Sequence, residues 1–159
     1  MTRVTVVIER WTTDEERGAL LVALRDEGTK GLVRAMQDLN VGYVQLRNSL
    51  GWRIRTAATW QTEEGRKVRV TTDRPMNLQE QYKGTRSKDY PIGIIEFVLP
   101  PEDAGEGVLL AATQVQFDDQ GRIEVKSLPY NTGPQKLTMV EKVVPKKKKK
   151  KKKKKSETE

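Results

Sequence analysis

The chain has 159 residues, with 30 Lys and Arg against 22 Asp and Glu, and it contains neither Cys nor His. This composition excludes disulfides, thiolate metal sites, cysteine nucleophiles and Ser-His-Asp triads, and it removes the commonest general base. No apolar run approaches the roughly 18 residues that a membrane-spanning helix needs. These absences favour a protein that is not an enzyme and that uses no metal or cofactor.

The first forty residues predict one strand and two short helices. Residues 3–11 alternate between apolar and polar side chains, which indicates a strand. Thr13 and Glu16 have the spacing of a capping box, in which each side chain accepts a hydrogen bond from the backbone of the other residue. Apolar residues then recur at helical spacing as far as Gly28, a suitable helix stop, and again after Thr29.

From residue 41 onward the apolar period changes to two, which indicates strands. The expected strands are 41–47, 52–60, a return strand around 68–70, 92–99, 108–117, 122–128 and 137–144. Most connections are short, so the strands should run antiparallel. Because the helices are grouped early in the chain instead of alternating with the strands, we predict an α+β fold. Its form would be a curved antiparallel sheet or partial barrel of about eight strands with an early pair of short helices.

Aromatic residues admit two interpretations. Trp52 and Trp60 share one face of the predicted strand with aliphatic residues, which favours the core of the sheet. The alternative is a stacking platform for bases or sugars, formed with Tyr43 and with Arg53 and Arg55 nearby. Trp11 is expected to be a core residue beneath the first helix.

Several short motifs between residues 3 and 144 resemble those of a family of small, exported, functionally uncharacterised proteins typical of acidobacterial-type genomes. The motifs are WTTDEER at 11–17, VGY at 41–43, SLG at 49–51, TDRP at 72–75 and RSKDYP at 86–91, with Glu96. The resemblance implies a sheet-rich domain, usually behind a signal peptide, and it supplies no catalytic residue. The sequence as written shows no signal peptide and so predicts the cytoplasm, whereas the resemblance predicts export with the leader removed.

The long polar segment 73–91 is the candidate ligand site, because long loops on a rigid sheet often hold binding groups. The candidate residues are Asp73, Arg74, Arg86, Asp89, Tyr90 and Glu96. The two arginines could clamp a carboxylate or phosphate through paired N–H donors. Alternatively, the charges form an Asp–Arg network that fixes the loop to the sheet. The three carboxylates could also form an acid–base pair with split pKa values, but their spacing matches no hydrolase motif.

Ten consecutive lysines dominate the charge of the chain. They are Lys146, Lys147, Lys148, Lys149, Lys150, Lys151, Lys152, Lys153, Lys154 and Lys155. Without them and the two glutamates that follow, the chain has 20 basic and 20 acidic residues, so the body is neutral. The lysines repel one another and bury no apolar surface, which predicts a single domain over 1–145 and a disordered tail over 146–159.

The tail predicts binding to anionic partners without specificity. Clustered lysines release counterions from nucleic acid and are attracted to anionic membrane surfaces, but they read neither base sequence nor lipid identity. We therefore predict a non-catalytic domain that binds such partners through its tail. The alternative is a small-ligand-binding or cell-envelope protein with a site near 73–96 and a tail that has no dedicated partner.

Overall fold

A computed structural model of the chain describes residues 3–46, 51–76, 90–102, 104–129 and 134–141. These residues form the predicted α+β fold, with one helix and nine strands, every paired strand being antiparallel. The helix is α1 (Asp14–Met36). The strands are β1 (Val4–Ile8), β2 (Gly42–Leu46), β3 (Trp52–Ile54), β4 (Thr56–Thr62), β5 (Gly65–Thr72), β6 (Ile92–Leu99), β7 (Gly105–Phe117), β8 (Ile123–Ser127) and β9 (Gln135–Val140).

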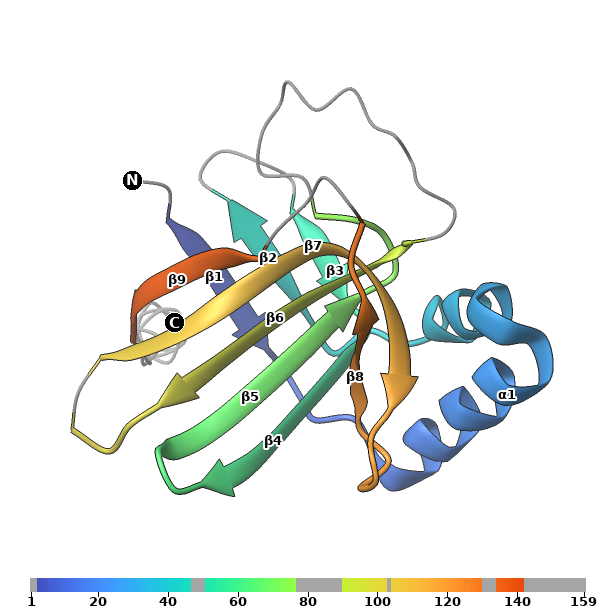
Figure 1. Ribbon diagram of the computed structural model, residues 1–159, viewed down its shortest axis with the longest axis horizontal. Coiled ribbons are helices and arrows are strands. Elements are labelled where there is room, and N and C mark those ends of the chain that lie inside the picture. The colour runs from blue at the N-terminus through green and yellow to red at the C-terminus, as the bar shows by residue number, and fades with distance from the viewer. Residues whose placement is uncertain (1–2, 47–50, 77–89, 103, 130–133, 142–159) are drawn as a thin grey trace, which may run out of the picture.

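The strands form two sheets. A small sheet has the order β1-β2-β3, and a larger sheet has the order β4-β5-β6-β7-β8, with β9 also paired to β7. Strand β7 has 13 residues; its first part pairs with β6 and β9, and its end pairs with β8 after a shift in register between Gln114 and Val115. This irregularity lets the large sheet curl into a half-barrel, with the small sheet behind it and α1 at one side (Figure 1).

Helix α1 begins at the predicted capping box. The backbone N–H of Glu16 donates to Thr13 Oγ1 at 3.1 Å, and the backbone N–H of Thr13 donates to Glu16 Oε1 at 3.0 Å. Gly28 has φ 71° and ψ −160°, which breaks the regular geometry and bends the helix. The two helices expected from the sequence are the two arms of α1, and they meet at a kink at Gly28, the predicted stop of the first helix.

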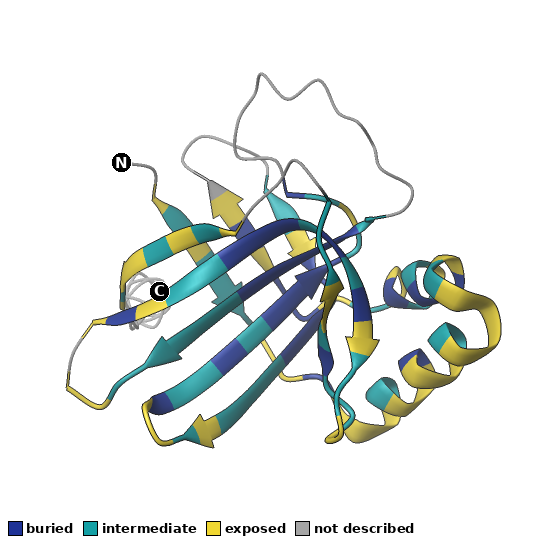
Figure 2. Ribbon diagram, in the orientation of Figure 1, coloured by how far each residue is buried: buried dark blue, intermediate teal, exposed yellow. Residues whose placement is uncertain are grey.

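Two hydrophobic clusters lie on opposite faces of the large sheet. One fills the space between the two sheets and contains Val44, Ile54, Val70, Ile95 and Leu109 among its buried members. The other joins α1 to the end of the half-barrel. Its buried members are Leu20, Leu32, Met36, Ile92, Ile94, Leu110, Val115 and Ile123. Figure 2 shows the buried residues in dark blue along the middle of the sheet and exposed residues on the outer side of α1.

The strand predicted over 52–60 is divided at Arg55 into β3 and β4, which belong to different sheets. The division changes which side chains share a face. Trp52 packs against the cluster between the sheets, as predicted, but after the break it is Ala57 that enters this cluster. Trp60 lies on the opposite face of the large sheet, so the prediction that both tryptophans share one core is wrong for Trp60.

Trp11 is also placed differently from the prediction. It is 38% exposed, and the Arg66 guanidinium lies 5.2 Å from the centre of its ring. The reason is that the chain between β1 and α1 runs along the edge of β4, where Thr12 exchanges hydrogen bonds with the backbone of Ala57 at 3.0 and 2.8 Å. Thr12 is thereby buried and its neighbour Trp11 faces outward.

Within the described residues, no helix is long and apolar enough to cross a membrane.

Candidate functional site

Four of the six residues predicted to form a ligand site can be placed. Asp73, Arg74, Tyr90 and Glu96 lie within the described ranges. Arg86 and Asp89 lie outside the described residues, and so does the lysine segment 146–155. The described part of the candidate site therefore consists of its two ends on the large sheet.

Asp73 directly follows β5 and faces Arg55. The carboxylate Oδ1 lies 3.1 Å from Arg55 Nε, and the two side chains are 13% and 17% exposed. The approach is electrostatic, since Nε does not have hydrogen-bond alignment. Arg55 Nη1 donates to the carbonyl oxygens of Leu39 at 2.7 Å and Gln37 at 3.2 Å, just beyond α1. Asp73 thus stabilises a cation that joins the sheet to the end of the helix.

Arg74 and Tyr90 flank the same end of the large sheet. Arg74 is exposed, and its Nη2 donates to the carbonyl of Gly51 at 3.3 Å, a long hydrogen bond. The carbonyl of Arg74 accepts from Thr72 Oγ1 at 2.7 Å, which fixes the backbone of this turn. Tyr90 is half-buried two residues before β6. Arg74 is therefore the predicted ligand group that is most accessible to solvent among those described.

Glu96 lies in the middle of β6, away from Asp73. It is opposite Arg69 in the register, and Arg69 precedes Asp73 by four residues along β5 and its extension. At about 3.3 Å per residue, the two carboxylates are separated by roughly 13 Å along the strand. Glu96 Oε1 contacts Lys67 Nζ at 2.7 Å and Oε2 contacts Arg69 Nε at 2.6 Å. Asp73 and Glu96 do not form a carboxylate pair, and each is paired with its own cation.

Glu96 belongs to a cluster of charges that surrounds an aromatic ring, which we call the Trp60 cluster. Its members are Trp60, Lys67, Arg69, Glu96, Asp118 and Arg122. The cationic groups of Arg122, Arg69 and Lys67 lie 3.9, 4.9 and 5.9 Å from the centre of the indole ring. A ring face attracts cations, so Trp60 and the two carboxylates together compensate three positive charges.

Both carboxylates of the Trp60 cluster are held in the ionised form. Partial burial of Glu96 opposes ionisation, but hydrogen bonds from Lys67 and Arg69 outweigh burial and lower its pKa below the usual value. Burial also opposes ionisation of Asp118, and the backbone N–H and guanidinium of Arg122 and the backbone N–H of Gln120 outweigh it, so its pKa is lowered as well. Neither group is suited to carry a proton near neutral pH, which general acid catalysis would require.

The Trp60 cluster holds the β7–β8 hairpin against the sheet. Arg69 Nη1 donates to the carbonyl of Ile123 at 2.8 Å, and Asp118 Oδ1 accepts from the backbone N–H of Gln120 and Arg122 at 2.8 and 2.9 Å. The turn is thereby fixed over the ring of Trp60. Sequence reasoning missed this cluster. The alternation of Lys67 and Arg69 with buried valines in β5 was visible, but nothing local shows that a turn about 50 residues later packs on them.

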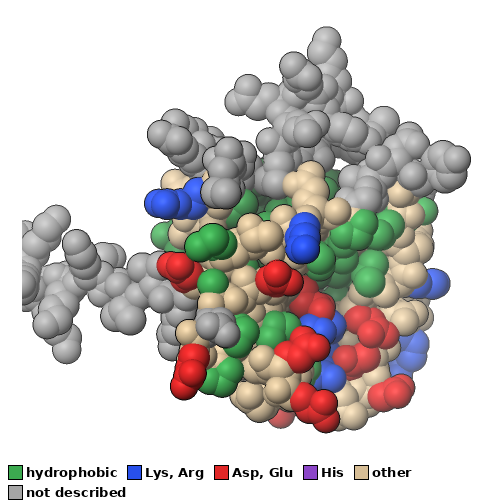
Figure 3. Space-filling model, turned by 60° about the vertical axis from the view of Figure 1, so that its left-hand side comes forward, with side chains coloured by type: hydrophobic (Ala, Val, Ile, Leu, Met, Phe, Trp, Pro, Cys, Tyr) green, Lys and Arg blue, Asp and Glu red, His purple; other side chains and the backbone are tan. Residues whose placement is uncertain are grey.

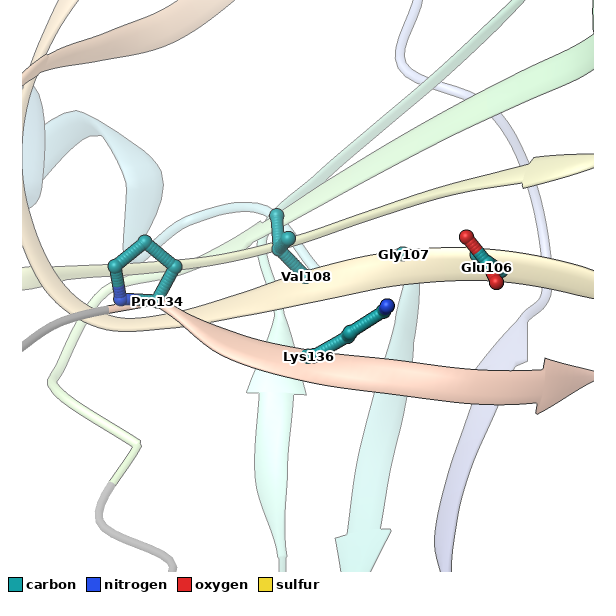
Figure 4. Close-up of a pocket in the computed structure, with 5 residues that line it drawn as sticks. All are labelled: Glu106, Gly107, Val108, Pro134 and Lys136. Carbon is teal, nitrogen blue, oxygen red and sulfur yellow. The ribbon is translucent and has the colours of Figure 1, made fainter.

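Two shallow hollows occur on the described surface, and neither includes a predicted ligand residue. One, of about 360 Å³, lies over β7 and β9 and is lined by Glu106, Gly107, Val108, Pro134 and Lys136 (Figure 4). The other, of about 400 Å³, lies between the bend of α1 and the end of β7. Within the residues described, no group of three or more Asp and Glu side chains converges to hold a metal ion.

Comparisons with known protein families, characterised proteins and solved structures give no match to this chain. The resemblance to the exported bacterial family therefore stays a prediction from the motifs. The remaining indications of function are the charge of the chain and the exposure and contacts of its described side chains.

Proposed function

We propose that the protein is a non-catalytic domain that binds polyanions, nucleic acid or an anionic surface, through Lys146–Lys155. One observation carries the proposal: the formal net charge of +8 comes entirely from the tail, because the rest of the chain has equal numbers of basic and acidic residues. A run of ten ammonium groups attracts any dense array of phosphates through counterion release.

The arrangement of charges on the folded body supports this division of roles. Many cations of the described residues are paired with carboxylates. The pairs are Arg10–Glu16, Arg17–Asp14, Arg25–Asp26, Arg34–Glu27, Arg55–Asp73, Lys67–Glu96, Arg69–Glu96, Arg69–Asp118 and Arg122–Asp118. Figure 3 shows acidic and basic side chains interleaved on the surface. A face of this kind attracts polyanions weakly, whereas the lysine run has no acidic residue within it.

Neutralising the tail tests the proposal. Replacing all ten lysines of 146–155 with Gln keeps the length and removes the charge. We expect affinity for duplex DNA at low salt to fall by more than tenfold, because most phosphate contacts are lost. The melting temperature should stay unchanged, because the tail contributes no apolar packing. Equal affinity of the two chains would remove the tail from the account.

A second candidate function is a small-anion site near 73–96, which the exposure of Arg74 and its long hydrogen bond to Gly51 favour. Arg74→Ala and Arg86→Ala should then abolish binding of inorganic phosphate or succinate, measured by calorimetry, with the unfolding free energy unchanged. Lys126→Ala, which removes an exposed cation on β8, is the matched control. A loss of more than about 2 kcal/mol of stability in both arginine variants would instead indicate the structural Asp–Arg network.

A further inference from the structure

The outer face of the three-stranded sheet exposes an aromatic ring beside an arginine. In β1 the residues Val4, Val6 and Ile8 pack toward the cluster between the sheets. Because side chains alternate along a strand, the intervening positions face away from that cluster. On this outer side the register aligns Val7, Tyr43 and Arg53 in one row across β1, β2 and β3.

Tyr43 is accessible in this row. It is 42% exposed, Arg53 is exposed as well, and Val7 is half-buried beside them. The neighbouring row pairs Thr5 with Gln45, both exposed and polar. The ring therefore stands on an open, mostly polar sheet surface.

Arg53 is held next to the ring by Asn40. With the Asn40 amide oriented so that both of its ends are satisfied, its oxygen accepts from Arg53 Nη1 at 2.9 Å and its nitrogen donates to the carbonyl of Gly42 at 3.3 Å. Among the described residues, Arg3 is a second cation that strand alternation places on this side of the sheet, and Glu9 is the carboxylate that follows β1. The guanidinium is thus oriented in advance, and its other N–H donors have no acceptor assigned among the described residues, so they can contact a phosphate.

The other candidates for stacking are placed differently. Trp52 packs against the cluster between the sheets, and the ring of Trp60 is faced by three cations. The ring of Trp11 is faced by Arg66. Of the aromatic platform considered from the sequence, the structure therefore keeps Tyr43 and Arg53 and removes the two tryptophans.

We infer that this outer face, formed by Tyr43 and Arg53, is a stacking site for single-stranded nucleic acid. A base lies against Tyr43 while Arg53 contacts an adjacent phosphate, as on other single-strand-binding surfaces. The inference rests on the proposed function, since the lysine tail supplies the long-range attraction. A membrane fits this face less well, because Thr5, Gln45 and Arg53 surround the ring and leave little apolar surface to insert.

The experiment compares two probes of equal charge on the full chain. One is an oligothymidine of about 20 nucleotides, longer than a typical single-strand site, and the other is an abasic strand of the same length. Binding is measured for the wild-type chain, for Tyr43→Thr, which removes the ring but keeps a residue suited to a strand, and for Tyr43→Phe, which keeps the ring. Arg53→Gln is compared with Lys126→Gln as its matched control.

We expect Tyr43→Thr to weaken oligothymidine binding about fivefold or more and to leave the abasic strand unaffected, because stacking needs a base. Tyr43→Phe should bind as the wild type does. Arg53→Gln should weaken both probes more than Lys126→Gln does. The same melting temperature in all variants shows that the sheet is intact. If Tyr43→Thr lowers the melting temperature, the inference is judged from the binding of Tyr43→Phe and Arg53→Gln instead.

An oligothymidine-to-abasic preference that Tyr43→Thr leaves unchanged would overturn the inference. So would a Tyr43→Thr variant that loses binding to phosphatidylserine vesicles but not to oligothymidine. A different result would contradict the proposed function: the affinity for the abasic strand would stay unchanged when the lysines of 146–155 are replaced with Gln. The preference for a base could still be measured in that case, as the ratio of the affinities for the two probes.

Discussion

At the scale of single residues, Glu16 links the start of α1 to the segment before it. Hydrogen bonds from Arg10 and from the backbone of Thr13 lower its pKa from 4.5 to about 2. Arg10 Nη1 and Nη2 contact the two carboxylate oxygens at 2.7 and 2.8 Å. A carboxylate with this geometry closes the capping box and forms a bidentate ion pair at the same time.

Glu16→Gln should therefore destabilise the protein in a pH-dependent way. Glutamine keeps the capping hydrogen bond but loses the charge. The folded pKa is below the unfolded one, so the contribution of the carboxylate is present above about pH 4.5 and is lost as the pH falls toward 2. Because solvent screens the pair, we expect a difference of at most about 1 kcal/mol at pH 7.

Urea unfolding of both chains at pH 7 and near pH 2 checks this expectation. Thr13→Ala, which removes the capping hydroxyl and no charge, serves as the comparison. A stability difference between wild type and Glu16→Gln that stays the same at the two pH values would contradict the assigned ion pair.

At the scale of elements, the bend of α1 depends on one backbone conformation. Gly28 has positive φ with extended ψ, a region that is nearly restricted to glycine, although nothing lies within 4 Å of the place where a Cβ would be. Gly18, in the first arm of the same helix, is also in open space but without a positive φ. The two glycines therefore separate backbone strain from crowding.

Gly28→Ala should lower the unfolding free energy by about 1–3 kcal/mol, the usual cost of such strain. Gly18→Ala should raise it by about 0.5–1 kcal/mol, because alanine loses less backbone entropy in a helix. Thermal unfolding followed by circular dichroism measures both. If Gly28→Ala were as stable as Gly18→Ala, the bend would not need the positive φ.

The elements also show how far sequence reasoning reaches. The capping box and the bounds of β6 follow from local chemistry and were predicted. The break at Arg55 was not, because it follows from the contacts of Arg55 with Asp73 and with the chain beyond α1, which are distant in sequence. The Trp60 cluster was missed for the same reason. Because its cations face the ring of Trp60, this residue no longer belongs to the predicted stacking platform.

At the scale of the whole molecule, the charge is divided between a neutral body and a cationic segment at 146–155. The body has equal numbers of basic and acidic residues, and about half of the cations in its described residues are paired with carboxylates. The lysine run places ten positive charges on ten consecutive residues, and counterion release from nucleic acid needs no fixed geometry. Attraction and any preference for bases should therefore come from different parts of the chain.

The salt dependence of DNA binding tests this separation most directly. Each phosphate that a lysine neutralises on duplex DNA adds about −0.9 to the slope of log affinity against log salt concentration. We expect the wild-type slope to be several units steeper than that of the chain with Gln at 146–155, approaching a difference of about −9 if all ten lysines engage. Equal slopes for the two chains would contradict the account.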